Sequence, residues 1–187
     1  FVMYRPGAVP PTTRAYSQVT IASDGRSAAV AERASPDFRI RNFVTGQTVQ
    51  VSLRADPTSD AFIEWPVLSL DGKHVAYAWT GPETNWNYQV RVSSLQPGAK
   101  PKALGSPFPC VFVRAWAPDS KSVLVVLLGT GNSSRMGWMS VTDGTVTTVK
   151  VHDGKGVGSL ALSPDGRSIA YDALVEPGKT DREIRII

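Results

Sequence analysis

Few residues in this 187-residue sequence have a type and spacing that could support catalysis or cofactor binding. Residues Gly178–Thr180 read Gly-Lys-Thr, which is the end of a phosphate-binding loop. Such a loop also needs a glycine five residues before Gly178 and a helix after the motif, whereas Ala173 and a strand-like run stand there. We therefore expect an ordinary loop at this place and no nucleotide cofactor.

The other candidate catalytic motifs are also incomplete. The glycine-rich stretch Gly129–Gly137 lacks dinucleotide-loop spacing and is expected to join two antiparallel strands. No Gly-x-Ser-x-Gly motif occurs for a serine nucleophile, and His74, His152 and Cys110 do not have zinc-ligand spacing. Asp-Gly pairs could coordinate calcium, but a turn-forming Asp needs no metal. We expect no catalytic residue, no metal and no cofactor in this chain.

The overall composition is that of a globular protein with a sizeable core. Hydrophobic residues make up 42% and charged residues 19%, and the net charge is +4. The 20 Lys and Arg residues are scattered singly, so we expect no nucleic-acid partner. A single cysteine permits no internal disulfide, and no apolar run is long enough for membrane insertion. The start, FVMYRPGAVPP, lacks Met and the apolar core of a signal peptide, so we expect a mature protein or an excised domain.

One short motif occurs four times at a regular spacing. The last copy is LSPDGRSIAY, Leu162–Tyr171, and the earlier copies are Ile21–Val30, Leu68–Tyr77 and Trp116–Val125. Their shared aspartates are separated by 47, 48 and 46 residues and are Asp24, Asp71, Asp119 and Asp165. So regular a period indicates a repeat architecture.

Each copy has the chemistry of a tight turn between two strands. The Asp can accept hydrogen bonds from the backbone just after it, and Gly adopts a positive φ without steric cost. Ser120 replaces this Gly in the third copy, where we expect a strained turn or one of another type. We therefore assign a structural, turn-forming role to the four aspartates.

The segments around each turn predict four antiparallel strands per repeat. The run after the turn, such as Val75–Trp79 or Val123–Leu127, is apolar on both faces, and two further strands follow it. A sheet with two apolar faces must stack against its neighbours, and a β-propeller does this while leaving only short edges. We found no helical periodicity of useful length. The predicted fold is all-β, a β-propeller of four-stranded antiparallel blades.

The four motif copies resemble the TolB-like propeller repeats, also called PD40 or WD40-like repeats. The resemblance extends from about Tyr16 to Ile187 and is best in the fourth copy. Copies one and two have Ser23 and Leu70 where the family has Pro, and copy three lacks the Gly. The resemblance implies a propeller, but such repeats occur in proteins with many functions.

The repeats predict a single domain over residues 1–187. The repeats are expected at about 15–53, 61–104, 111–151 and 157–187, and the last one stops after its third strand. Residues 1–5 could supply the missing outer strand and close a four-bladed ring. The alternative is that the chain is part of a larger ring.

Strand alternation places the loops between second and third strands at one end of the blades, opposite the Asp-Gly turns. These loops are the longer ones, and loops on a rigid scaffold are the usual place for recognition. Trp86 and Tyr88, in the polar stretch WTGPETNWNY, are the first candidates for partner binding. Arg135 and Trp138 of the next repeat are the second, and for each pair the alternative is packing between blades.

These features favour a non-enzymatic module that binds a protein or peptide partner. By resemblance it would be bacterial and periplasmic or extracellular. The alternative is a non-catalytic propeller that gates substrate access in a larger enzyme, such as a prolyl-oligopeptidase-like serine peptidase. A third hypothesis is catalysis or small-ligand binding in the central channel. A homodimer and a continuation into further blades both stay open.

Overall fold

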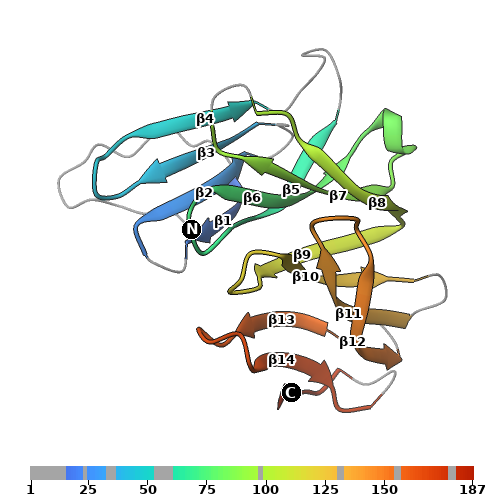
Figure 1. Ribbon diagram of the computed structural model, residues 1–187. Helices are drawn as coiled ribbons and strands as arrows, with labels where there is room; N and C mark the ends of the chain where they lie inside the picture. Colours follow the sequence, from blue (N-terminus) through green and yellow to red (C-terminus); the bar gives the residue numbers. More distant parts are fainter. Residues whose placement is uncertain are drawn as a thin grey trace.

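The computed structural model describes residues 16–22, 25–32, 37–52, 61–96, 99–129, 133–153, 157–176 and 180–187. These residues form four antiparallel sheets, in each of which the strands pair in chain order (Figure 1). The first sheet contains β1 (Tyr16–Ile21), β2 (Ser27–Glu32), β3 (Asp37–Asn42) and β4 (Thr48–Ser52). The second contains β5 (Phe62–Leu68), β6 (His74–Thr80), β7 (Tyr88–Ser94) and β8 (Lys102–Phe108).

The third sheet contains β9 (Cys110–Trp116), β10 (Ser122–Leu128), β11 (Ser133–Ser140) and β12 (Val146–Asp153). The fourth contains β13 (Val157–Leu162), β14 (Ile169–Leu174) and β15 (Arg182–Ile186). The first strands of the sheets lie next to one another, β1 beside β5, β5 beside β9 and β9 beside β13. The sheets are therefore the blades of a β-propeller, and we number them one to four.

The core lies between the blades, as expected for sheets with two apolar faces. One cluster of buried side chains joins blades one and two, a second joins blades two and three, and a third joins blades three and four. Val75–Trp79 of β6 and Val123–Leu127 of β10 are buried at every position, because each strand has a neighbouring blade on both sides. The all-β propeller prediction is confirmed.

The Asp-Gly turns join the first and second strands of each blade. Asp71 Oδ1 accepts hydrogen bonds from Ser69 Oγ (2.6 Å) and the Lys73 amide (3.1 Å). Asp165 repeats this arrangement with Ser163 and Arg167, and Asp119 accepts from the Lys121 amide. Asp24 lies outside the described residues.

The third-repeat turn keeps the same shape without its glycine. Ser120 has φ 56°, close to the 65° of Gly72 and the 72° of Gly166. A left-handed conformation is costly for a residue with a Cβ, so the expected strain is present and the turn type is unchanged.

Two strands extend beyond their predicted bounds. The pairing of β8 with β7 continues to Phe108, past the predicted end at Leu104. The register shifts beside Gly105 (φ 62°), and the pairing is regained where Phe108 lies opposite Tyr88. The third strand of blade three starts at Ser133 and not at Gly137, because its regular ladder with β10 continues through polar residues. The proposed closing strand at residues 1–5 lies outside the described residues.

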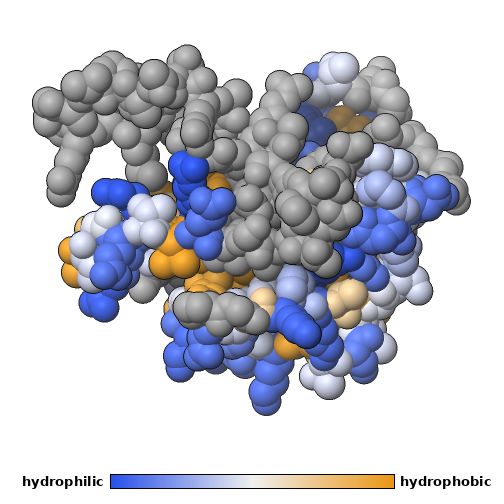
Figure 2. Space-filling view, turned by 90° about the horizontal axis from the view of Figure 1, so that it is seen from above, coloured by the Kyte–Doolittle hydropathy of each residue, from blue (hydrophilic) through white to orange (hydrophobic). Residues whose placement is uncertain are grey.

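The structure has little helix in its described part. Only a 3-10 turn, η1 (Pro82–Thr84), occurs there, and no described helix is long and apolar enough to cross a membrane. Figure 2 shows the molecule from above. On this face the described residues are mostly hydrophilic, and smaller hydrophobic areas are exposed between them.

Candidate functional site

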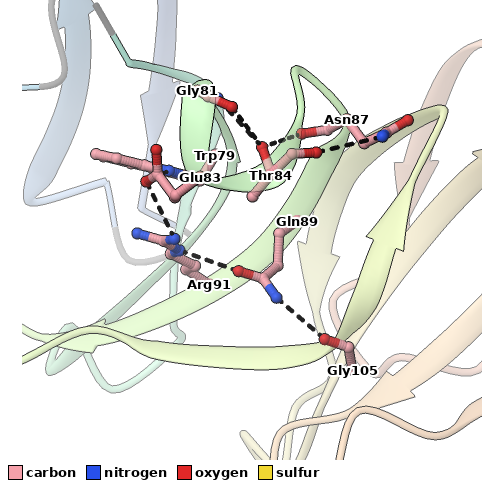
Figure 3. Close-up of polar contacts among 8 residues, drawn as sticks. All are labelled: Trp79, Gly81, Glu83, Thr84, Asn87, Gln89, Arg91 and Gly105. Atoms are coloured by element: carbon pink, nitrogen blue, oxygen red, sulfur yellow. Dashed lines mark hydrogen bonds and ion pairs between the residues drawn. The ribbon is translucent and has the colours of Figure 1, made fainter. Parts of the chain in front are cut away.

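The loop between β6 and β7 is closed by a compact set of hydrogen bonds. The Gly81 carbonyl accepts from the amides of Thr84 (3.1 Å) and Trp86 (3.0 Å), and Thr84 Oγ1 lies 3.0 Å from the same oxygen (Figure 3). Asn87 is bound back to Thr84 through its amide (3.0 Å) and through Nδ2 (3.2 Å). Asn85 and Trp86 both have left-handed backbones, with φ 50° and 60°. The loop is therefore a defined turn that holds Trp86 in one backbone position.

A chain of side-chain contacts ties this loop to the sheet below it. The Glu83 carboxylate accepts from the Trp79 indole and pairs with the Arg91 guanidinium at 3.5 Å. Arg91 lies over the Trp79 ring, and its Nε donates to Gln89 Oε1 at 3.4 Å. Gln89 Nε2 in turn donates to the Gly105 carbonyl of β8 at 3.1 Å (Figure 3). The loop, β6, β7 and β8 are thus connected by polar contacts.

Close packing fixes the start of the loop as well. A Cβ added to Gly81 would lie 2.6 Å from Ala61 Cβ, closer than two carbon atoms can approach. The backbone of the loop therefore packs directly on the residue that precedes β5.

The two predicted aromatic residues of this loop have different surroundings. Trp86 is 51% exposed at the tip of the turn. Tyr88, the first residue of β7, is half-buried, with its ring centroid 5.8 Å from that of Trp65. Its hydroxyl hydrogen-bonds with the Glu64 carboxylate. Trp86 is thus about half exposed to solvent, and Tyr88 belongs to a second group of side chains near the first strands.

We call this second group the inner-strand cluster. Trp65 lies against Phe112 with ring centroids 4.5 Å apart, which joins β5 to β9, and the Arg114 guanidinium lies 4.9 Å from the Phe112 centroid. Each of the four first strands has an irregularity in its pairing, and those of β5, β9 and β13 fall at Trp65, Arg114 and Gly158. The cluster members are all half-buried: Glu64, Trp65, Tyr88, Phe112 and Arg114.

The backbone and the polar atoms of this cluster are unusual. Trp65 has φ 51°, a left-handed conformation that costs energy for a bulky residue. Among the described residues, the buried Glu64 Oε2 and Arg114 Nε make no hydrogen bond. Arg114 does donate through its terminal nitrogen to the Gly158 carbonyl of β13, at 3.0 Å. Backbone strain of this kind clusters at functional sites, and a buried charged atom without a hydrogen bond calls for an explanation.

Burial shifts the pKa values of this cluster toward its neutral forms. Desolvation raises the pKa of Glu64, although the hydrogen bond from Tyr88 opposes the change. The pKa of Tyr88 is raised to about 12, first by burial and then by the Glu64 charge. Burial also lowers the pKa of Arg114, against the attraction of Asp172. Glu64 and Arg114 therefore both lie where burial disfavours the charged form of the side chain.

Arg135 and Trp138 are not brought together by the structure. Both lie within β11, where residues three apart point to opposite faces of the sheet. Trp138 is half-buried against the cluster between blades three and four. Arg135 pairs with Leu127 and Val151 on the face directed to blade two. They sit in a strand and not in the loop in which the sequence placed them.

Four members of the inner-strand cluster were missed by sequence reasoning, namely Glu64, Trp65, Phe112 and Arg114. A signal was present, because FIEWPVL and CVFVRAW each carry one charged residue within an otherwise apolar strand. In the described part of the chain, no group of three or more His, Cys, Asp or Glu side chains is placed to hold a metal ion.

Comparison with known proteins supports the fold and does not assign a family. No family model matches the chain, and no curated protein matches its sequence. Among solved structures, the chain is similar to TolB from Acinetobacter baumannii, with 17% identity and a TM-score of 0.67 over 90% of this chain. It is also similar to the β-propeller domain of the Trilobed protease from Pyrococcus furiosus, with 14% identity and a TM-score of 0.60 over 92% of this chain.

A third similar structure is dipeptidyl peptidase 4 from Porphyromonas gingivalis, with 14% identity and a TM-score of 0.56 over 83% of this chain. The chain spans 40%, 55% and 29% of the lengths of these three chains. At such identities the comparison establishes a β-propeller module, and function has to be argued from the site.

Proposed function

We propose that this chain is a non-enzymatic β-propeller module that binds a protein or peptide partner. The binding surface is the blade end that carries the 81–87 loop, with Trp86 as its main contact. The observation that carries the proposal is the combination of an exposed tryptophan and a tightly bonded loop. Tryptophan is the residue type most enriched among energetically dominant interface contacts.

The rigidity of the loop is what makes Trp86 suited to binding. Ordering a mobile loop on association costs free energy, and this cost is avoided where the bound backbone is already formed. Gly81, Thr84 and Asn87 hold the turn by backbone and side-chain hydrogen bonds, and the Glu83–Arg91 ion pair anchors it to β7. A partner that contacts Trp86 therefore meets a preformed surface.

The inner-strand cluster extends this surface toward the first strands. Tyr88 directly follows the loop and contacts both Trp65 and Glu64. Aromatic rings together with an arginine are typical of the centres of protein interfaces. Arg135 and Trp138 are secondary candidates, and their positions on opposite faces of β11 allow only one of them to join a given contact.

The wider setting of the module is part of the same proposal. The resemblance of the four repeats to TolB-like repeats supports a single propeller domain over residues 1–187 and a bacterial protein in the periplasm or outside the cell. Fractionation of the cells into culture medium, periplasmic extract and cytoplasm would test the location. Recovery of the protein in the cytoplasmic fraction alone would contradict it.

A peptide selection tests the binding role. A random peptide library is displayed and selected on the immobilised chain, and the dissociation constants of enriched peptides are measured by fluorescence polarisation. Trp86→Ala should weaken binding at least about tenfold, as for a dominant interface tryptophan. Val44→Ala, which changes an exposed residue in the turn between β3 and β4 at the opposite end of the blades, is the control and should leave binding unchanged. Equal binding by the wild type and both variants would refute the proposal.

A second candidate function is a substrate-gating propeller within a larger enzyme. It is supported by the structural similarity to the propeller domain of a protease. This chain also spans only 55% of that chain and 29% of the dipeptidyl peptidase 4 chain, as one domain of a larger enzyme would. Sequencing the gene on both sides separates the two candidates. An adjoining hydrolase domain favours gating, and an adjoining membrane anchor or regulatory domain favours partner binding.

A further inference from the structure

The fourth blade exposes the face that the other blades bury against their next neighbour. Ile184 and Ile186 of β15 are 80% and 70% exposed. β14 pairs with β15 so that Ile184 lies opposite Asp172 and Ile186 opposite Ala170. Both isoleucines therefore point to the face of the sheet that is turned away from blade three.

The equivalent positions of blades two and three are covered. In blade two, Val90 occupies the position of Ile184, and in blade three Met136 does. Both are fully buried, Val90 in the cluster shared with blade three and Met136 in the cluster shared with blade four. The repeat thus places an apolar residue at this position for contact with a following blade, and on blade four the contact is missing from the described chain.

Blade one has a partly exposed face of the opposite kind, the one that in the other blades contacts the preceding blade. Its Ala29 and Ile40 pack against blade two, so the alternate residues point away from the other blades. Ile21 is one of these and is 55% exposed, and Arg41 on the same face is exposed as well, whereas Ala28 between them is fully buried. The described residues contain a hydrophobic cluster at three blade junctions and none between blades four and one, which lie at the two ends of the series (Figure 1).

We propose that the open face of blade four is an inter-blade interface that receives blade one of a second copy of this chain. Each of the three described blade junctions joins the following-side face of one blade to the preceding-side face of the next. A second copy supplies both missing halves, because its blade one meets blade four of the first copy and its blade four meets blade one. Two such junctions related by a twofold axis form a closed dimer, the commonest kind of protein oligomer.

The partly polar character of the blade-four face fits a junction between chains. Asp172 stands where Ala78 and Val126 are buried in blades two and three, and it is paired with Arg182 at 2.9 Å. It also accepts hydrogen bonds from the Gly158 and Ser159 amides. This satisfied ion pair tolerates water better than the apolar residues of the internal junctions, and interfaces between separately folded chains have such polar margins.

Analytical ultracentrifugation of the 187-residue chain and its variants tests the proposal. The wild type should sediment at twice the chain mass of 20.1 kDa. Ile184→Asp/Ile186→Asp should raise the dimer dissociation constant at least about tenfold, because charged groups enter the apolar junction. The matched control, Val149→Asp/Val151→Asp, alters exposed residues at the same spacing on outer strand β12 and should leave the dimer intact.

A variant on the other half of the junction distinguishes the proposed pairing from other contacts. Ile21→Asp should weaken the dimer as the blade-four variant does. A mixture of the two variants should regain part of the dimer, because a mixed dimer has one wild-type junction. A circular dichroism spectrum that matches the wild type shows that each variant is folded. A monomeric wild type, or a dimer that Ile21→Asp does not weaken, would overturn the proposal, and the monomer would point to further blades as the natural cover.

Discussion

Arg91 lies over the face of Trp79, with its guanidinium carbon 4.3 Å from the ring centroid. Trp79 belongs to the core between blades one and two, while Arg91 also pairs with Glu83 of the 81–87 loop. One side chain therefore couples the packing of a blade junction to the position of the candidate binding loop. The stability of the propeller and the shape of its proposed binding surface depend on the same contacts.

Replacement of Arg91 tests this coupling. Arg91→Met keeps much of the side-chain volume but removes the contact of a cation with the ring and the ion pair with Glu83. We expect a loss of about 1–2 kcal/mol in the free energy of unfolding, measured by urea denaturation. Arg135→Met, with no described ion pair of the same kind, should change it by less than about 0.5 kcal/mol. An equal effect of the two substitutions would contradict the coupling.

Gly81→Ala tests the close approach of the loop to Ala61. The added methyl group would lie 2.6 Å from Ala61 Cβ, so the loop must shift. We expect a destabilisation of about 1–3 kcal/mol, as for other overpacked sites. Because Ala61→Gly removes the opposing methyl group, the double variant should be more stable than Gly81→Ala. A double variant with no recovery would show that the contact is not the cause.

Ser120→Gly should stabilise the protein. Ser120 has φ 56° in a turn whose counterparts in the other repeats carry glycine, so the substitution removes backbone strain. The expected gain is about 0.5–1 kcal/mol, observed as a higher midpoint of urea unfolding. The reverse change at an equivalent turn, Gly166→Ser, should lower the midpoint. A lower midpoint for Ser120→Gly would mean that the Ser120 side chain contributes more than its backbone costs.

The ion pair of Asp172 predicts a dependence of stability on pH. The hydrogen bonds from Arg182 are the main reason that the pKa of Asp172 lies below its usual 3.8, and bonds from the Gly158 and Ser159 amides add to this effect. An acid with a lowered pKa in the folded state stabilises the fold above its unfolded pKa and loses this contribution as the pH falls through the folded pKa. Asp172→Asn should therefore unfold more easily than the wild type at pH 7.

The difference between these two proteins should shrink below about pH 3.8 and vanish once the wild-type carboxylate is protonated. Unfolding by urea at a series of pH values, with both proteins at equal ionic strength, measures it. A difference that persists unchanged into strong acid would show that Asp172 acts by shape and not by charge.

The repeated motif allowed the fold to be predicted from the sequence, whereas the candidate site was predicted only in part. The four Asp turns and the doubly apolar runs at Val75–Trp79 and Val123–Leu127 led to stacked four-stranded sheets, which the structure has. Trp86 could be singled out because a tryptophan in a polar stretch is conspicuous. The inner-strand cluster was missed because it forms from strands about 48 residues apart, in which Glu64 and Arg114 appear as isolated charges.

The loop contacts could not be foreseen for a related reason. The left-handed Asn85 and Trp86 and the Glu83–Arg91 pair depend on the three-dimensional course of the chain. In β11, polar residues continued a ladder that hydrophobicity alone would have ended, and Arg135 and Trp138 were therefore placed in a loop.

Amide hydrogen exchange with a selected peptide bound tests most directly whether the loop-bearing end is the binding surface. Mass spectrometry compares the free chain with the peptide complex, segment by segment. The account predicts new protection in residues 81–88, with weaker protection at 62–66 and 110–114. Protection confined to the opposite end, at the turns of Asp71, Asp119 and Asp165, would contradict it.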